Sequence, residues 1–215
     1  MGSQALAANI IGSNNTAIGY GANMTAGMNY SNATALGSLA IVNASNKVRI
    51  GDNAVTEVNI AATAIYTGSD RRFKENIDET GVRGLEFINR LRPVIYNFNT
   101  RKFTEFLTQT MPDSIKKSYL AKDYTASKAI RHSGFIAQEV EQAADEVGYD
   151  FDAISKPKNE NDNYSLAYSQ FVVPLVKAVQ ELSKQNDDLK KEMEELKAMV
   201  KNLTVENKTG SIKIS

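Results

Sequence analysis

The sequence lacks cysteine and contains a single histidine, His132. Without cysteine the chain can form neither a disulfide bond nor a thiolate metal site. The cysteine content therefore does not indicate whether the protein occupies an oxidising or a reducing compartment. One histidine excludes a histidine-rich metal site within one chain. We therefore expect no metal and no cofactor.

Net charge and a long hydrophobic run are missing as well. Lys and Arg together number 25, as do Asp and Glu, so charge gives no argument for nucleic acid or an acidic surface as a partner. No stretch approaches the ~18 apolar residues of a membrane helix, and the first residues lack the basic and apolar regions of a signal peptide. We expect no nucleic-acid partner and no membrane partner. The short N-terminus suggests a piece of a longer fibre.

Residues 1–66 are rich in Asn, Ala, Gly, Ser and Thr and carry a weak internal repeat. Its aliphatic-Gly pairs fall at 11/12, 18/19, 36/37 and 50/51, within the units NIIG (9–12), NTAIGYGA (15–22), NATALGSLA (32–40) and NKVRIGDNA (46–54). Each unit predicts a short strand followed by a Gly or Asn turn. Such a unit is too thin to bury a core alone, so it must stack on its neighbours or on other chains.

A flexible Asn- and Gly-rich linker is the alternative interpretation of these residues. It is opposed by recurring aliphatic residues that a linker does not need, namely Ile18, Leu36, Ile50 and Ile60. The repeats resemble the β-roll of trimeric adhesin heads, whose units carry a similar AIG-x-x-A pattern. This resemblance implies a β-roll-like segment shared by three chains.

Residues 67–168 mix charged and aromatic residues and predict a small α+β domain. Residues 82–93 place apolar side chains at helical spacing and end at a proline, which indicates a helix. Residues 93–99 alternate Val, Tyr and Phe, which indicates a strand. The polar stretch 100–128 predicts an elaborated loop or an insertion.

The second half of this segment predicts one more helix and two more strands. Residues 132–150 indicate a short strand that continues into a helix with Val140 and Ala144 facing inward. Residues 164–166 indicate another short strand. With the coiled coil of 169–206 described next, we expect a β-repeat segment at 1–66, the α+β domain at 67–168, and a tail at 207–215.

Residues 169–206 carry five heptads in register, with Lys and Glu outside, and predict a parallel coiled coil. Ser169 is the expected N-cap of this helix. An amphipathic helix packed on its own domain is an alternative for the first two turns only. A helix of about 50 Å is longer than a domain of about 100 residues, so its later turns would extend beyond the domain. The predicted oligomer core consists of Val172, Leu175, Val179, Leu182, Asn186, Leu189, Met193, Leu196, Val200 and Leu203.

The number of chains in this coil is ambiguous from the heptads alone. Val at position a with Leu at position d, plus one buried Asn, favours a parallel dimer. The β-roll resemblance favours three chains, and a coil must follow the symmetry of the segment before it. We therefore expect an intertwined homotrimer.

The stretch TGSDRRFKENI, residues 67–77, holds a candidate nucleophile. Serine needs a base within hydrogen-bond reach, and Lys74 could serve Ser69 if desolvation lowers the pKa of its amine. The five-residue offset suits a turn that enters a helix, with Ser69 at the turn. The alternative is an ordinary N-cap followed by a solvated charged face.

Four motifs, in order, carry a more specific resemblance: SDRRFKENI (69–77), LRPVIYNF (91–98), GFIAQEVEQ (134–142) and YSLAYSQFVVPLVKAVQEL (164–182). They resemble the self-cleaving intramolecular chaperone domains that close phage tail fibres, tailspikes and endosialidases. The resemblance covers about residues 67–190. It implies a C-terminal domain that trimerises and aligns three chains in register, so that the upstream fibre segment of each chain can fold. The domain then cuts itself off by a single-turnover serine endopeptidase reaction.

Carried over by position, the resemblance makes Ser69 the nucleophile, Lys74 the general base, and the bond between Gly68 and Ser69 the scissile bond. His132 lies near the position where some members carry a functional histidine and is a third catalytic candidate; a partly buried histidine at a strand edge is its alternative. The motif residues Asp70, Arg72 and Asn76 are expected to orient the turn or to bond a neighbouring chain.

The resemblance also implies a virion tail fibre or a bacterial cell surface as the location, with the chaperone domain released after assembly. Two alternatives remain. One is a clamp of the same family that does not cleave and stays attached as a structural tip. The other is a trimeric surface adhesin whose β-roll binds a host receptor, although aromatic and charged side chains across the repeats are few.

Overall fold

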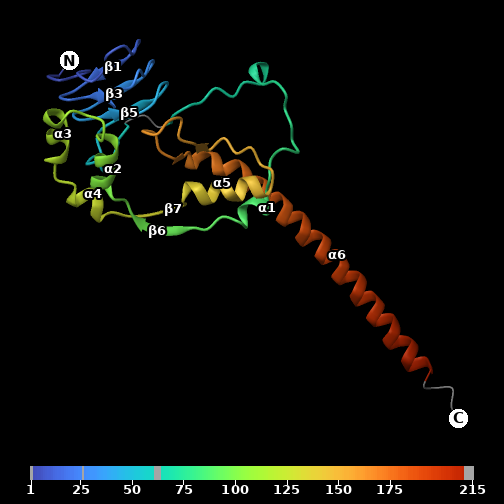
Figure 1. Ribbon diagram of the computed structural model, residues 1–215. Coiled ribbons are helices and arrows are strands. Elements are labelled where there is room, and N and C mark those ends of the chain that lie inside the picture. The colour runs from blue at the N-terminus through green and yellow to red at the C-terminus, as the bar shows by residue number, and fades with distance from the viewer. Residues whose placement is uncertain (1, 26, 61–63, 211–215) are drawn as a thin grey trace. The chain divides into compact units, whose positions relative to one another are not determined.

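The computed structural model describes residues 2–25, 27–60 and 64–210, and the side chains of these residues up to 204 (Figure 1). It is a mixed α/β chain with four small sheets in the described residues and a long C-terminal helix. The elements are β1 Thr16–Ile18, β2 Asn23–Met24, β3 Thr34–Leu36, β4 Ile41–Val42, β5 Val48–Ile50, η1 Arg71–Phe73, α1 Leu85–Ile88, β6 Val94–Asn97, α2 Thr100–Leu107, α3 Asp113–Leu120, α4 Thr125–Ala129, β7 Arg131–Gly134, α5 Ala137–Glu146, β8 Ile154–Ser155, β9 Ser165–Leu166, η2 Tyr168–Phe171 and α6 Val172–Gly210.

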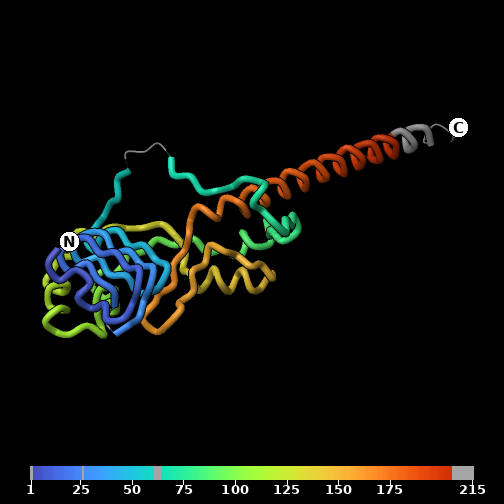
Figure 2. Tube along the Cα trace, turned by 90° about the horizontal axis from the view of Figure 1, so that it is seen from above, coloured from blue at the N-terminus to red at the C-terminus, as the bar shows by residue number. Residues whose placement is uncertain are grey.

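The N-terminal repeats stack on one another within the chain. Strands β1, β3 and β5 form a parallel sheet in that order, with Ile18, Leu36 and Ile50 in register. Strands β2 and β4 pair in parallel as a second small sheet. Figure 2 shows the successive turns of this segment in blue, lying one above the next. The aliphatic-Gly spacing therefore predicted three of the strands, whereas residues 9–12 form no strand and the linker interpretation is wrong for the stacked turns.

Small side chains fill the inside of the stack. Ala17 and Ala35 point inward and are buried, because alternate residues of a strand face opposite sides. Closely stacked turns leave room there for alanine. The recurring aliphatics lie outside instead, with Ile18 and Ile50 56% and 55% exposed. The sequence argument correctly took these aliphatics as a sign of structure, but they do not form the core.

Glycine is required where two turns approach each other. Gly19 has a φ of 127°, in the region that favours glycine, and a Cβ placed on it would lie 2.6 Å from the carbonyl carbon of Gly37. Gly37 has a φ of 109° and lies against the backbone of Gly51 in the next turn. The same backbone conformation thus repeats from turn to turn.

The stretch 100–128 is helical, so the expectation of a loop was wrong. It forms α2, α3 and α4, and Asn99 begins α2 by accepting a hydrogen bond from the backbone N–H of Lys102 at 3.0 Å. Phe103, Phe106 and Leu107 occupy positions i, i+3 and i+4, the spacing of one helix face. The polar residues between them hid this short pattern.

The other predicted strands are confirmed. β6 and β7 form an antiparallel pair, and β7 leads into α5, in which Val140 and Ala144 are buried as expected. β8 pairs with β9, which covers the strand predicted near residue 166. The helix predicted for 82–93 is only the single turn α1, which buries Phe87.

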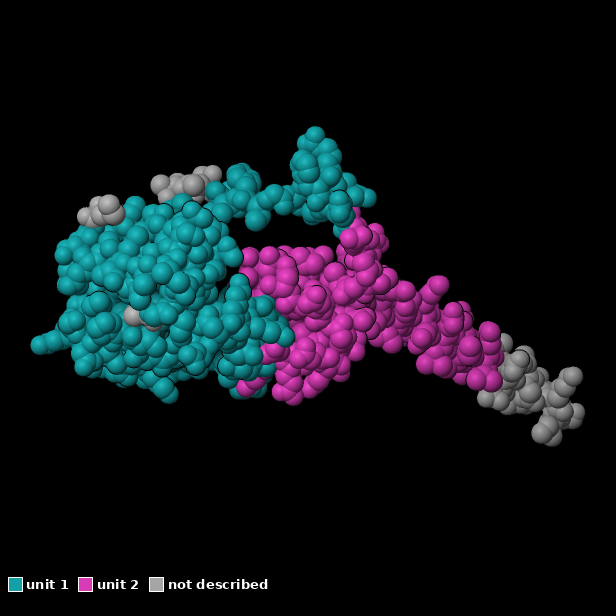
Figure 3. Space-filling model, turned by 45° about the horizontal axis from the view of Figure 1, so that its top comes forward, with its two compact units in different colours: residues 1–75, 92–138, 154–166 teal, residues 76–91, 139–153, 167–215 magenta. Residues whose placement is uncertain are grey.

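The chain divides into two compact units, coloured in Figure 3. Unit 1 comprises residues 1–75, 92–138 and 154–166, and unit 2 comprises residues 76–91, 139–153 and 167–215. Both units combine stretches far apart in the sequence. The domain boundaries expected at 66/67 and 168/169 stay a prediction.

Unit 2 is held by an aromatic cluster and by contacts between α1 and α6. The ring of Phe151 lies edge-on to Phe87 and Phe171, with centroids 5.0 and 4.9 Å away. Glu181 of α6 accepts a hydrogen bond from the backbone N–H of Leu85 at 2.8 Å and so satisfies a free donor at the start of α1. Ser169 lies inside the 3-10 turn η2, so it does not cap α6, which begins at Val172.

In unit 1, a buried ion pair ties the segment before β9 to the repeats. Lys47 Nζ lies 2.8 Å from Asp162 Oδ1, and the Asp162 side chain is only 2% exposed. Burial by itself would raise the pKa of Asp162, but hydrogen bonds from Lys47 and from the backbone N–H groups of Asn163 and Lys158 outweigh it and lower the pKa below its usual value. The ionised carboxylate is therefore the form that stabilises the fold.

Replacing Gly19 by Ala should lower the free energy of unfolding by about 1–3 kcal/mol, because the new Cβ meets the backbone of Gly37 and the φ is strained. Urea denaturation at a fixed chain concentration measures the change. The exposed neighbour Ser38→Ala is the control and should stay within about 0.5 kcal/mol. Equal effects for the two variants would contradict the close stacking.

The lowered pKa of Asp162 predicts a pH-dependent stability. Because the folded-state pKa lies below the unfolded value of about 3.9, the contribution is fully present above that value and is lost as the pH falls through the folded-state pKa. Asp162→Asn should therefore lower the urea midpoint at pH 7 and reduce its fall below about pH 4. Asp187→Asn, in an exposed pair with Lys190, is the control; the same result for both variants would exclude a special role for Asp162.

Candidate functional site

The segment with the candidate nucleophile forms a capped 3-10 turn. Asp70 caps η1 by accepting a hydrogen bond from the backbone N–H of Arg72 at 2.9 Å, and its carboxylate also lies 2.6 Å from Arg72 Nη2. The hydrogen bonds from Arg72 lower the pKa of Asp70. Asn76 has a φ of 50°, in the left-handed region. Asp70 and Arg72 therefore shape this turn, as the sequence analysis predicted, while the role of Asn76 stays a prediction.

Ser69 and Lys74 flank this turn and are exposed. Within the described part of the chain, neither the Ser69 hydroxyl nor the Lys74 amine makes a hydrogen bond or an ion pair, so the single chain does not bring them together. A lysine becomes a general base when burial lowers the pKa of its amine, and nothing covers Lys74 here. The dyad therefore stays a prediction that needs a further covering surface.

Large apolar side chains surround the same turn without being buried. Tyr66 is 91% exposed, Phe73 81% and Ile65 80%. A Cβ on Gly68 would meet no atom within 4 Å, so in this conformation no crowding requires glycine at the predicted scissile bond. The segment thus presents apolar groups that the fold of one chain leaves in water.

His132 lies in β7, in register with Tyr96 of β6, and the centroids of their rings are 5.7 Å apart. It is half-buried, which agrees with the alternative of a partly buried strand histidine. Among the described residues, no hydrogen bond joins His132 to Ser69 or Lys74. A catalytic role for His132 stays a prediction.

His132 lines a cavity of about 350 Å³ in unit 1, which sequence reasoning did not find. Its wall combines the end of the repeats with β6, α2 and β7, so no local pattern could have revealed it. Arg49 and Asp52 are charged residues in its wall. Arg49 Nε donates to the carbonyl of Gly51, Nη2 donates to Asn53, and the guanidinium lies 6.0 Å from the centroid of Phe103. Burial lowers the pKa of Arg49, and the charge of Asp52 opposes this effect.

The cavity can hold a small polar group, but it offers no set of metal ligands. Among the residues that the structure describes, no three His, Cys, Asp or Glu side chains gather in one place. In this described part of the chain, no helix is long and apolar enough to cross a membrane.

Helix α6 presents two different apolar faces. Pro174 and Ala178 are buried in unit 2, in which α6 contacts α1. The residues of the predicted oligomer core, called the heptad row from here on, lie on a helix face displaced by one residue from these buried positions. They are exposed to solvent, with Val179 65% and Leu196 61% exposed. The alternative of a helix packed on its own domain therefore holds for the first turns, but with a different face from the heptad row.

Comparison with known proteins gives one family. Residues 69–149 match the family described as chaperone of endosialidase. This is the family that the four sequence motifs indicated, and the match covers three of the four motifs. No curated protein matches the chain.

Proposed function

Because residues 69–149 carry the endosialidase-chaperone domain, we propose that the chain is an intramolecular chaperone that trimerises, aligns a phage-type tail fibre or spike, and cuts itself between Gly68 and Ser69. The observation that carries this proposal is the start of the family match at Ser69, the predicted nucleophile. The domain thus begins where the sequence motifs locate the cut.

Trimerisation is supported by the apolar surface that one chain leaves in water. Along α6, the large apolar residues of the heptad row are all between 46% and 65% exposed: Val172, Leu175, Val179, Leu182, Leu189, Met193, Leu196, Val200 and Leu203. Burying each of these side chains against another chain would contribute about 1.5–3 kcal/mol. Parallel chains in register would cover the whole row at once.

The proposed cut proceeds in two steps. The Ser69 hydroxyl attacks the carbonyl carbon of Gly68 while Lys74 accepts the hydroxyl proton. The bond between the Gly68 carbon and the Ser69 nitrogen then breaks, the nitrogen takes a proton, and an ester remains on Ser69. Water hydrolyses the ester, giving the Gly68 carboxylate and a free Ser69 with its amine and hydroxyl.

Assembly would supply the desolvation that this chemistry requires. Ile65, Tyr66 and Phe73 are exposed around Ser69 in the single chain, and covering them with neighbouring chains would exclude water from Lys74. A lower pKa of the Lys74 amine would follow. Cleavage would then depend on correct trimerisation, which is the order a folding clamp needs.

A permanent structural tip is the second candidate. It is favoured by one observation, the absence of contact between Ser69 and Lys74 in the described chain. In that case the domain aligns the chains in the same way and stays attached. In both cases the proposed location is a virion tail fibre, which the family match supports.

Denaturing mass spectrometry of the folded protein tests the cut. We expect the wild type to separate into two fragments between Gly68 and Ser69, because it carries both residues of the proposed dyad. We expect Ser69→Ala and Lys74→Ala to remain whole near 23.6 kDa. Thr67→Ala, which leaves both groups in place, is the matched control and should be cut. A wild type that stays whole as a folded trimer would exclude autoproteolysis and favour the structural tip.

The heptad row can be tested by paired serine substitutions in α6. Leu189→Ser with Leu196→Ser should abolish the trimer at micromolar concentration, since each change removes about 2 kcal/mol of apolar burial from every chain. Light scattering after gel filtration should show the mass fall from three chains to one. The control is Lys184→Ser with Lys191→Ser, at positions outside the row.

A parent protein with the mass of two chains would correct the number of chains to the dimer that the heptads alone favour. A single-chain parent would contradict the coiled coil itself. Neither result depends on whether Ser69 is catalytic.

A further inference from the structure

A cut between Gly68 and Ser69 would leave the repeats and the chaperone domain bonded by no peptide, yet they share one hydrophobic core. In unit 1, Leu39 and Ile41 of the repeats pack in the same cluster as Leu107, Met111 and Tyr119. All five are buried, the least exposed being Tyr119 at 1% and Leu107 at 2%. Half of this core lies on each side of the predicted cut.

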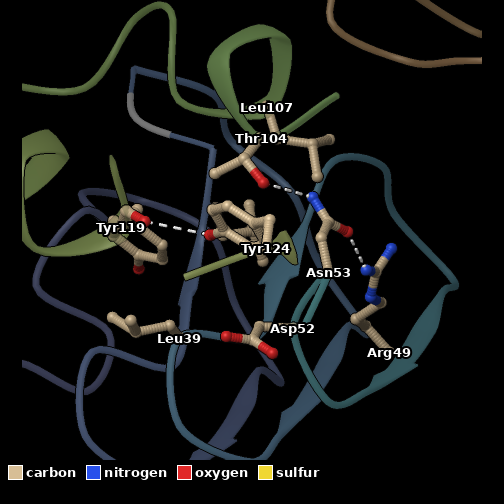
Figure 4. Close-up of a pocket in the computed structure, with 9 residues that line it drawn as sticks. Leu39, Arg49, Asp52, Asn53, Thr104, Leu107, Tyr119 and Tyr124 are labelled. Atoms are coloured by element: carbon tan, nitrogen blue, oxygen red, sulfur yellow. Dashed lines mark hydrogen bonds between the residues drawn. The ribbon is translucent and has the colours of Figure 1, made fainter. Parts of the chain in front are cut away.

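Polar contacts cross the same boundary. Asn53 Nδ2 donates to Thr104 Oγ1 at 2.7 Å (Figure 4). The Tyr119 hydroxyl donates to the carbonyl of Gly21, and Lys122 pairs with Asp52, whose side chain is 3% exposed. Burial raises the pKa of the Tyr119 hydroxyl, which therefore stays protonated and donating.

Little empty space remains between these groups. The cavity enclosed by Leu39, Asp52, Leu107, Tyr119 and their neighbours measures about 10 Å³, no more than one water molecule occupies. The Tyr119 cluster is therefore closely packed. The cavity of about 350 Å³ lies beside it, between Asp52 and Asn53 on one side and Phe103 on the other.

A second group of contacts joins the repeats to residues 156–163. Lys47 pairs with the buried Asp162, and Tyr30 donates to Asn159 Oδ1 at 3.3 Å. Asn43 Nδ2 donates to the carbonyl of Asn161 and to Asn163 Oδ1, each at 3.0 Å. The stack of repeats is thus held at two places.

We propose that residues 100–128 and 156–163 form a docking surface for the repeats of residues 2–56, and that this surface keeps the two fragments bound after the peptide bond is broken. Cleavage and release are then separate events, and release needs a further step that opens the shared core. This inference rests on the proposed function only for the origin of the cut, since the surface exists in the uncut chain.

Cutting the chain by an added protease tests the surface independently of autoproteolysis. In a Ser69→Ala background, a recognition sequence for a site-specific endoprotease is inserted after Thr67, in the exposed segment, and the folded protein is cut to completion. We expect both fragments to leave gel filtration together at micromolar concentration in physiological buffer and to separate only in denaturant. Separation without denaturant would overturn the proposal.

Substitutions in the docking surface distinguish docking from entanglement, in which the fragments stay together only because the chains of the oligomer are intertwined. Tyr119→Phe removes the donor to Gly21, and Leu107→Ala truncates the shared core, so each should raise the dissociation constant of the cut fragments about tenfold or more. Tyr119→Phe keeps the volume of the ring, which protects against failure to fold. The control, Arg101→Ala on the exposed side of α2, should leave the dissociation constant unchanged.

Fragments that remain equally bound in the parent, Tyr119→Phe and Leu107→Ala proteins would overturn the docking surface in favour of entanglement. A wild type that never cuts itself would instead refute the proposed autoproteolysis and leave these results intact. The two failures are therefore distinguishable.

Discussion

Burial of Leu39 and Ile41 beneath Leu107 and Tyr119 is the interaction on which unit 1 depends. The stacked turns have an interior built largely of alanine, which contributes little apolar area. Leu107 of α2 and Tyr119 of α3 add larger side chains to Leu39 and Ile41 of the repeats. The repeats and residues 100–128 thus share one core, and the stretch that was expected to be a loop or an insertion joins them.

The single chain exposes large apolar side chains in three regions. The heptad row of α6, the outward strand residues Ile18 and Ile50, and the side chains around Ser69 are all left in water. Monomeric proteins seldom expose so much apolar surface in ordered rows. The proposed trimer explains all three regions by one assembly, and it would also explain why the single chain leaves Ser69 and Lys74 apart.

The sequence predicted the features that follow from local periodicity. The register of Ile18 with Leu36 and Ile50 could be read from the spacing of the aliphatic-Gly pairs, and the strands β6, β7 and β9 from alternation. Helices α2 to α4 were missed because each spans eight residues or fewer, too short for an apolar period to stand out among polar neighbours. The cavity beside His132 and the core around Tyr119 join stretches that lie 40 residues or more apart, and no local pattern specifies such pairings.

Tyr119 in α3 and Lys122, two residues after its end, contact different turns of the stack. The Tyr119 hydroxyl donates a hydrogen bond to the carbonyl of Gly21, which follows β1. Lys122 forms an ion pair with Asp52, which follows β5, two strands further along the sheet. An extra turn inserted between them would move these two partners apart by one strand spacing, about 4.7–4.9 Å. Tyr119 and Lys122 could then no longer reach both. Residues 119–122 therefore match a stack of three strands, and a stack of two or four strands would not place Gly21 and Asp52 within reach of both side chains.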